Sequence, residues 1–280
     1  MNETLVSHWM ATDIIAADPH TRLHDALRTM NNHQIRSLPV VEDGRLAGIV
    51  TKRDLLRADV TTVMKDIWDQ YRIVGNLPLA NIMTREVVTI RPQADMVQAA
   101  QRLLENKITC LPVLDEDEKM IGILTSSDIF RFIIADMKNQ IAPTQVKEYM
   151  TRAVETITPG DDIMTAHRLM SLKRFRALPV MQEGLLVGIV TRTDLLSAAP
   201  SVSTSQGRQD ISIQIFSTPV RYLMTSSPLT IGKDQSLAEA AQAMLENKIH
   251  SLPVMDADHN LCGIITETDL FQSVYERILA

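Results

Sequence analysis

The sequence predicts an α/β (α+β) fold of four strand-helix-strand-strand-helix repeats, paired into two modules. Three observations carry this prediction: a tripeptide that returns four times, a signature that follows every copy, and a helical pattern of apolar residues ahead of it. The length of 280 residues allows about two domains of ordinary size.

The recurring tripeptide is Leu-Pro-Val, and its prolines are 73, 67 and 74 residues apart. Its copies are Leu38–Val40, Leu111–Val113, Leu178–Val180 and Leu252–Val254. After each comes a short polar turn, then an apolar strand ending in Gly-apolar-apolar-Thr-x-x-Asp. These signatures begin at Gly48, Gly122, Gly188 and Gly263. We therefore expect a hairpin in every repeat, with a helix directly after its second strand.

Helical spacing of apolar residues precedes each tripeptide. In the second repeat the apolar face is Met96, Ala99, Ala100, Leu103 and Leu104, and the helix should end near Asn106. A short strand, such as residues 87–90, should come before each helix. A unit of roughly 50 to 60 residues buries too little apolar surface to be comfortably stable alone, so neighbouring repeats must pack together.

The repeats also pair by similarity. The first and third share Arg36 and Arg176, the second and fourth share a Glu-Asn-Lys-Ile string, and superposition needs shifts of 140 and 141 residues. We expect a two-repeat module that was itself duplicated. The predicted repeats are 1–60, 80–136, 146–200 and 219–280, in modules 1–140 and 141–280. The linkers within the modules are Asp59–Ala80 and Pro200–Val220.

These motifs resemble the cystathionine-β-synthase (CBS) domain family, whose members occur as tandem pairs called Bateman modules. The resemblance covers nearly the whole chain and implies a stand-alone CBS-domain protein with two Bateman modules. In that family each pair forms two clefts, which commonly hold AMP, ADP, ATP or S-adenosylmethionine. The modules are often fused to a channel, transporter or enzyme; here the four repeats use up the length.

The signature aspartates have a chemistry that suits a ribose. A carboxylate has two acceptor oxygens that match two adjacent hydroxyls, and a helix start attracts anions. By resemblance the aspartate binds ribose and the threonine lies beside phosphate. The pairs are Thr51 and Asp54, Thr125 and Asp128, Thr191 and Asp194, and Thr266 and Asp269. Thr-x-x-Asp before an apolar run is equally a helix capping box, and this alternative stays open.

Positive charge near these helix starts should decide where phosphate binds. The residues after the threonines are Lys52, Ser126, Arg192 and Glu267, and Arg53 follows Lys52. Two residues before each Leu-Pro-Val stand Arg36, Thr109, Arg176 and His250, where nucleotide-binding relatives carry an Arg or His that reaches phosphate. We expect one strongly phosphate-binding cleft per module, around Asp54 and Asp194, and Glu267 counts against a charged ligand. Clefts in this family borrow residues, so Arg36 or Arg176 could instead serve Asp128 or Asp269.

The adenine base would contact strand residues near Thr89-Ile90, Thr156-Ile157 and Thr230-Ile231. The first repeat departs from this pattern with Ala16-Ala17, and the fourth has Gly232-Lys233 where the others end in proline. A Thr-Ile pair is also typical of any ordinary strand.

Other motifs give no sign of catalysis, so we expect no enzyme and no metal. His20 and His24 are spaced for one helix face but lack a third ligand, and Asp115–Glu118 is a hairpin turn rather than a calcium loop. Cys110 and Cys262 sit in apolar runs, where a buried hydrophobe is expected. Trp68 and Tyr71, in the first linker, should pack onto their module.

Charge and hydropathy narrow the function classes. The net charge of −6 is shared equally between the two halves, which argues against nucleic acid and anionic lipid as partners. No apolar run approaches the roughly 18 residues of a membrane span, and no secretory signal opens the chain, so the expected compartment is the cytoplasm.

The leading hypothesis is a cytoplasmic, non-enzymatic sensor of adenine nucleotides that regulates a separate, unknown target protein. The alternative is a structural or assembly protein with degenerate, ligand-free clefts. The two modules could pair within one chain into a disk, and a homodimer of chains is equally compatible with the sequence.

Overall fold

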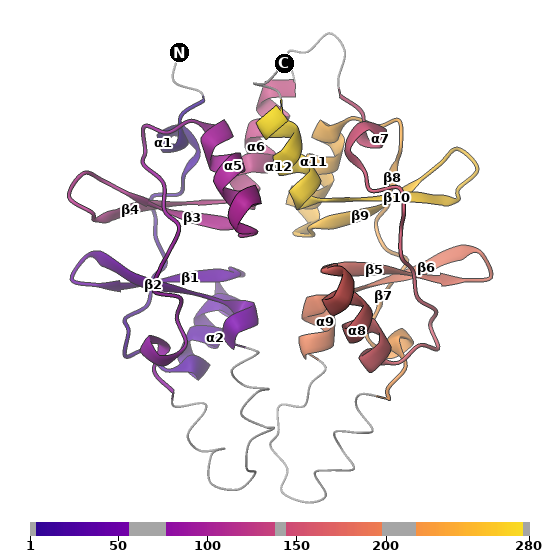
Figure 1. Ribbon diagram of the computed structural model, residues 1–280, viewed down its shortest axis with the longest axis horizontal. Helices are drawn as coiled ribbons and strands as arrows, with labels where there is room; N and C mark the ends of the chain where they lie inside the picture. Colours follow the sequence, from indigo (N-terminus) through magenta and orange to yellow (C-terminus); the bar gives the residue numbers. More distant parts are fainter. Residues whose placement is uncertain (1–3, 56–76, 138–143, 198–216, 277–280) are drawn as a thin grey trace, which may run out of the picture. The chain divides into compact units, whose positions relative to one another are not determined.

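The protein is described here from a computed structural model, which places residues 4–55, 77–137, 144–197 and 217–276. The chain divides into two compact units, one of residues 1–132 with 271–280 and the other of residues 133–270, and each is described by itself (Figure 1). Both contain the two expected hairpins, so the mixed α/β fold of four repeats is confirmed.

The first two repeats alternate short helices with hairpins. Their elements are α1 (Val6–Trp9), α2 (Leu23–Asn32), β1 (Ser37–Glu42), β2 (Arg45–Thr51), η1 (Leu79–Asn81), α5 (Met96–Asn106), β3 (Cys110–Leu114), β4 (Met120–Thr125) and α6 (Ser126–Met137). The hairpins β1–β2 and β3–β4 lie side by side, because Met120 N–H donates to the Gly44 carbonyl at 3.3 Å (Figure 1).

The last two repeats follow the same plan. Their elements are α7 (Val146–Tyr149), α8 (Ile163–Lys173), β5 (Ala177–Gln182), β6 (Leu185–Thr191), α9 (Arg192–Ser197), η2 (Val220–Tyr222), β7 (Thr225–Ser226), β8 (Ile231–Gly232), α11 (Leu237–Asn247), β9 (Ser251–Met255), β10 (Leu261–Thr266) and α12 (Glu267–Glu276). In every repeat a helix begins directly after the signature threonine, as expected.

The helices ahead of the tripeptides form where local signals agree. Asp95 caps α5 by accepting a hydrogen bond from Gln98 N–H at 2.8 Å, and α5 ends before Lys107, which is left-handed with φ 55°. The apolar face is buried, as at Met96 and Leu103. The predicted end near Asn106 is confirmed because the cap, the periodicity and the stop all lie in consecutive sequence.

The short strand expected before each of these helices is mostly reduced to one paired residue. Ile90 makes an isolated parallel bridge with Val113, donating to Pro112 at 3.0 Å and accepting from Leu114 at 3.1 Å. Only the fourth repeat extends this pairing, in the two-residue β8. In the second repeat the chain leaves the sheet at once, since Pro92 has no N–H for a longer ladder.

A feature that sequence reasoning missed is an exchange of segments within each pair of repeats. The opening segment of the first repeat pairs with the hairpin of the second: the N–H groups of Ala11 and Ile123 donate to each other's carbonyls at 2.9 Å. Conversely, Thr84, in the opening segment of the second repeat, pairs with Ile49 in the hairpin of the first. Each repeat therefore supplies a segment that pairs with the hairpin of its neighbour.

The third and fourth repeats exchange segments in the same way. Thr151 forms an isolated bridge with Ile264 in β10, and β7 pairs with β6. A methionine precedes the paired residue in all four cases and lies against the signature glycine of the other repeat. These methionines are Met10, Met83, Met150 and Met224. A side chain larger than hydrogen on these glycines would occupy the same space as the methionine sulfur.

The remaining expectations about single residues have mixed outcomes. Cys110 is buried, but Cys262 is only half-buried and its thiol lies 3.4 Å from the Val254 carbonyl oxygen, so the expectation for Cys262 was wrong. Trp68 and Tyr71 lie outside the described residues. In the described part of the chain, no helix has both the length and the apolar character needed to cross a membrane.

Candidate functional site

All four signature aspartates bond to their own threonine. In each repeat one carboxylate oxygen, Oδ2, accepts both the N–H and the hydroxyl of the threonine. For the first repeat these distances are 2.9 and 2.6 Å, for the second 2.7 and 2.8 Å, for the third 2.8 and 2.7 Å, and for the fourth 2.7 and 2.8 Å. The N–H groups of Asp54 and Asp194 also donate to their threonine Oγ1 at 3.3 Å, so the reciprocal capping box is complete in the first and third repeats. In the second and fourth repeats the described bonds form only its carboxylate half.

The cap changes how such an aspartate could hold a ribose. A carboxylate oxygen accepts about two hydrogen bonds, so Oδ2 is filled by the threonine and only Oδ1 remains. Oδ1 of Asp54, Asp194 and Asp269 accepts no hydrogen bond from any residue that the structure describes. Ribose binding by these aspartates stays a prediction, and in this arrangement Oδ1 is the oxygen that a ribose hydroxyl could reach without breaking the bonds to threonine.

Asp128 differs from the other three. Its Oδ1 accepts a hydrogen bond from Arg131 Nη1 at 2.6 Å, and the residue is 2% exposed. Burial raises the pKa of Asp128, against the opposing effect of its bonds to Thr125 and Arg131. Burial likewise raises the pKa of Asp269. Arg131 was not among the expected site residues; its position one helical turn after Asp128 was the available signal.

Arg36 reaches across to the neighbouring repeat. Its Nη2 donates to Ser126 Oγ at 3.0 Å, at the first residue of α6, and Ser126 is buried. The structure thus places Arg36 beside the helix of Asp128 rather than with Asp54. This contact agrees with the expectation that a cleft borrows its arginine from the neighbouring repeat, and the position of a phosphate stays a prediction.

Arg176 makes the corresponding contact in the other pair of repeats. Its Nη1 forms an ion pair with Glu267 Oε1, at the first residue of α12. Glu267 is only 1% exposed, and its Oε2 lies 3.1 Å from His250 Nδ1. Arg176 and His250 therefore both lie beside an internal carboxylate, and Arg176 lies with the helix of Asp269 rather than with Asp194.

A family model for the CBS domain matches residues 6–61, 79–135, 146–201 and 220–276. The chain belongs to the CBS domain family.

Two relatives align with this chain along most of their own length. The uncharacterised protein MJ1225 of Methanocaldococcus jannaschii is 29% identical over 92% of this chain and 94% of its own length. Its crystal structure, described as that of a candidate archaeal homologue of g-AMPK, superposes with a TM-score of 0.78 at 26% identity, covering 96% and 99% of the two chains. An uncharacterised 33.4 kDa protein of Thermofilum pendens is 27% identical over 89% of this chain and 84% of its own.

Arg192 of the third CBS repeat has a structural role that the sequence did not reveal. Its Nη2 donates to the carbonyls of Met170 at 2.8 Å and Phe175 at 3.1 Å, at the C-terminal end of α8. Because those carbonyls have no partner within the helix, the guanidinium satisfies them. Arg192 therefore acts as a cap of α8 in this structure, and its expected contact with phosphate stays a prediction. Lys52 is half-buried and Arg53 exposed in the first turn of the first signature helix.

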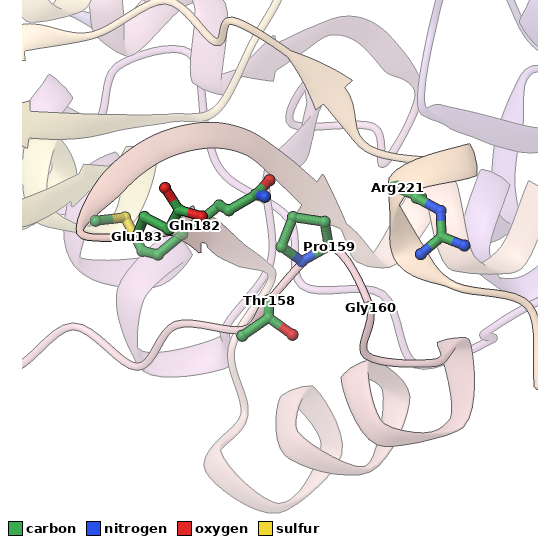
Figure 2. Close-up of a pocket in the computed structure, with 7 residues that line it drawn as sticks. Thr158, Pro159, Gly160, Gln182, Glu183 and Arg221 are labelled. Carbon is green, nitrogen blue, oxygen red and sulfur yellow. The ribbon is translucent and has the colours of Figure 1, made fainter.

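The predicted base positions lie where the parallel bridges form. Ile90 and Ile157 are bridged to the valines of their CBS tripeptides, and Ala17 takes the same place in the first repeat. A hollow of about 420 Å³ lies beside this position in the third repeat (Figure 2). It is lined by Thr158, Pro159, Gly160, Met181, Gln182, Glu183 and Arg221. None of the signature aspartates lines this hollow.

The motifs set aside as metal sites show no such arrangement. Within the described ranges, no three His, Cys, Asp or Glu side chains gather as a metal site would require. In the 115–118 turn, Asp115 Oδ1 accepts from Asp117 N–H at 3.0 Å and Lys119 N–H at 2.9 Å. That aspartate closes the hairpin turn.

Proposed function

We propose that this protein is a non-enzymatic regulatory protein that binds an adenine nucleotide at the starts of its signature helices. One observation carries the proposal: the cap holds the aspartate carboxylates of Asp54, Asp194 and Asp269 in place, while Oδ1 stays without a partner in the described structure. An acceptor that is oriented in advance loses little entropy when a ribose hydroxyl binds it.

The phosphate group has its best partners in the second repeat. Ser126 offers a hydroxyl at the first residue of α6, and Arg36 adds a guanidinium next to it. Arg131, whose side chain is 55% exposed, can shift so that a ribose hydroxyl reaches Asp128 Oδ1 while its charge stays close to the carboxylate. We therefore place AMP, ADP or ATP first at this site, with S-adenosylmethionine as the less favoured ligand.

Regulation requires that the ligand stabilise one arrangement of the protein over another. We propose that nucleotide held between paired repeats changes how this chain contacts a separate target protein. The likeness to MJ1225 over almost the whole of both chains supports this role, since that protein is described as a candidate homologue of g-AMPK.

The second candidate function is structural assembly without a ligand. It is favoured by one observation: all four Thr-x-x-Asp motifs already act as caps, so folding alone accounts for them. The two candidates differ in what the loss of an aspartate should do.

The deciding experiment compares two double variants that each remove two caps. Asp128→Ala with Asp194→Ala removes two signature carboxylates, one of them at the site where AMP is placed first, and Asp95→Ala with Asp162→Ala removes two caps that lie outside the signatures. Each pair should cost about 1 kcal/mol of stability per cap. Binding of AMP, ADP, ATP and S-adenosylmethionine is measured by thermal shift and calorimetry.

Ligand at about a hundred times its Kd should stabilise the wild-type protein by roughly 2.7 kcal/mol and raise its Tm by several degrees. We expect the first double variant to bind fewer ligands per chain and the second to bind as the wild type does. Equal binding by both variants, or no binding by folded wild-type protein, would favour the assembly function instead.

A further inference from the structure

We propose that Glu267 makes the site of the fourth repeat select adenosine ligands without phosphate, so that it binds a nucleoside where the second repeat binds a nucleotide. The inference rests on the proposed function, because it assumes that the signature aspartates bind ribose. It assigns different ligand classes to two sites that are equivalent in the fold.

The two sites can be compared atom by atom. Ser126 and Glu267 each follow the capping threonine, each is 1% exposed, and each contacts the arginine of the preceding repeat. The difference is one functional group: a neutral hydroxyl beside Arg36 and a carboxylate beside Arg176. Glu267 brings a negative charge to the place where the other site would receive phosphate.

The basic side chains of the fourth-repeat site lie against this carboxylate. Arg176 is ion-paired with Oε1 of Glu267, and His250 Nδ1 lies 3.1 Å from Oε2. A buried carboxylate that loses its cation is strongly destabilised. Arg176 therefore does not readily leave Glu267 to bind an incoming phosphate. The Glu267 carboxylate at the first residue of α12 also offsets the positive end of the helix dipole. A phosphate here would meet a like charge and few donors.

The ribose end of the same site is intact. Oδ1 of Asp269 has no partner among the described residues, whereas Oδ1 of Asp128 is held by Arg131. The position in α12 that corresponds to Arg131 is Gln272, whose amide donates to Glu276 at 2.5 Å and leaves Asp269 alone. The fourth repeat therefore keeps the acceptor for sugar hydroxyls and lacks the cationic place for phosphate.

The test measures adenosine and AMP binding to the full chain by calorimetry. Glu267→Gln removes the charge and keeps the shape, and Asp269→Ala in the same background assigns any new binding to this site. We expect Glu267→Gln to strengthen AMP binding at this site by roughly tenfold or more and to leave adenosine binding almost unchanged. Glu267→Ser serves as a second variant with the side chain of the other site.

Ser126→Glu is the matched control in the first pair of repeats. Ser126→Glu should weaken AMP binding at that site roughly tenfold and weaken adenosine binding less. Circular dichroism melts confirm that each variant is folded. Suppose that the wild type binds adenosine and that neither Glu267→Gln nor Glu267→Ser changes the affinity for AMP. This result overturns the role of Glu267 and leaves the proposed function in place. If the folded wild type binds neither adenosine nor AMP, the proposed function is overturned with it.

Discussion

At the scale of the residue, the signature glycines are required by methionines that lie far away in sequence. A Cβ on Gly263 would lie 2.5 Å from the Sδ of Met150, and one on Gly48 would lie 2.6 Å from the Sδ of Met83. Both distances are shorter than any van der Waals contact. The glycine in this signature is therefore there for its size, and the exchanged segment needs that space.

We expect Gly263→Ala to lower the free energy of unfolding by about 1–3 kcal/mol, because the added methyl group overpacks the contact with Met150. Denaturant unfolding measures the change. Gly160→Ala is the control, since its Cβ would come no nearer than 3.9 Å to Thr158 Oγ1. If the clash with Met150 is the cause, adding Met150→Ala should cost less than the sum of the two single changes.

At the scale of the element, the start of a signature helix is used differently in each repeat. Ser126 binds Arg36, Glu267 binds Arg176, and Arg192 turns away to cap α8. All three side chains stand at the same place in the repeat, and all three begin a helix. Local sequence sets where the helix begins, whereas the contact of its first side chain depends on a neighbouring element.

Replacement of Arg192 should therefore change stability rather than ligand binding. Arg192→Met removes two hydrogen bonds to the Met170 and Phe175 carbonyls, and we expect a loss of about 1–3 kcal/mol in unfolding free energy. Arg168→Ala, an exposed change on the same α8, should change stability by less than about 0.5 kcal/mol. Loss of ligand affinity in Arg192→Met at unchanged stability would contradict the capping role.

At the scale of the whole molecule, sequence reasoning succeeds where the signals are consecutive. The hairpins and the end of α5 followed from a tripeptide, a cap and a periodicity that lie within a few residues of each other. The exchanged segments could not be predicted in this way, because Ala11 pairs with Ile123 across more than a hundred residues. No turn or cap near either residue indicates the other as its partner. One signal was available: Met10, Met83, Met150 and Met224 are 73, 67 and 74 residues apart, the same spacings as the prolines.

The candidate site was predictable to a similar extent. The residue types and the helix starts could be found from the signatures, but the partners of Arg36 and Arg192 could not. A long side chain can reach several elements, and only the packing of the two repeats selects one. The same limit applies to Asp128 and Asp269, which look alike in sequence and differ in what lies against Oδ1.

The exchange of segments also predicts which strand loses protection from hydrogen exchange when one segment is deleted. Deletion of residues 1–12 removes the partner of β4 and leaves Thr84, the partner of β2, in place. We expect hydrogen exchange to speed up in residues 120–125 more than in residues 45–51, because the Ile123 N–H loses its 2.9 Å bond to Ala11. Faster exchange in β2 than in β4 would contradict this arrangement.

Synthesis on the ribosome gives the same exchange a consequence in time. Ala11 leaves the ribosome early, yet its partner Ile123 is translated more than a hundred residues later. Ile49 likewise has no partner until Thr84 has been translated. At about 5–20 residues per second, the amino-terminal segment stays without its sheet partner for several seconds. Until Thr84 has been made, β2 of the nascent first repeat exposes an unpaired strand edge, so a chaperone would have the most to protect at this stage.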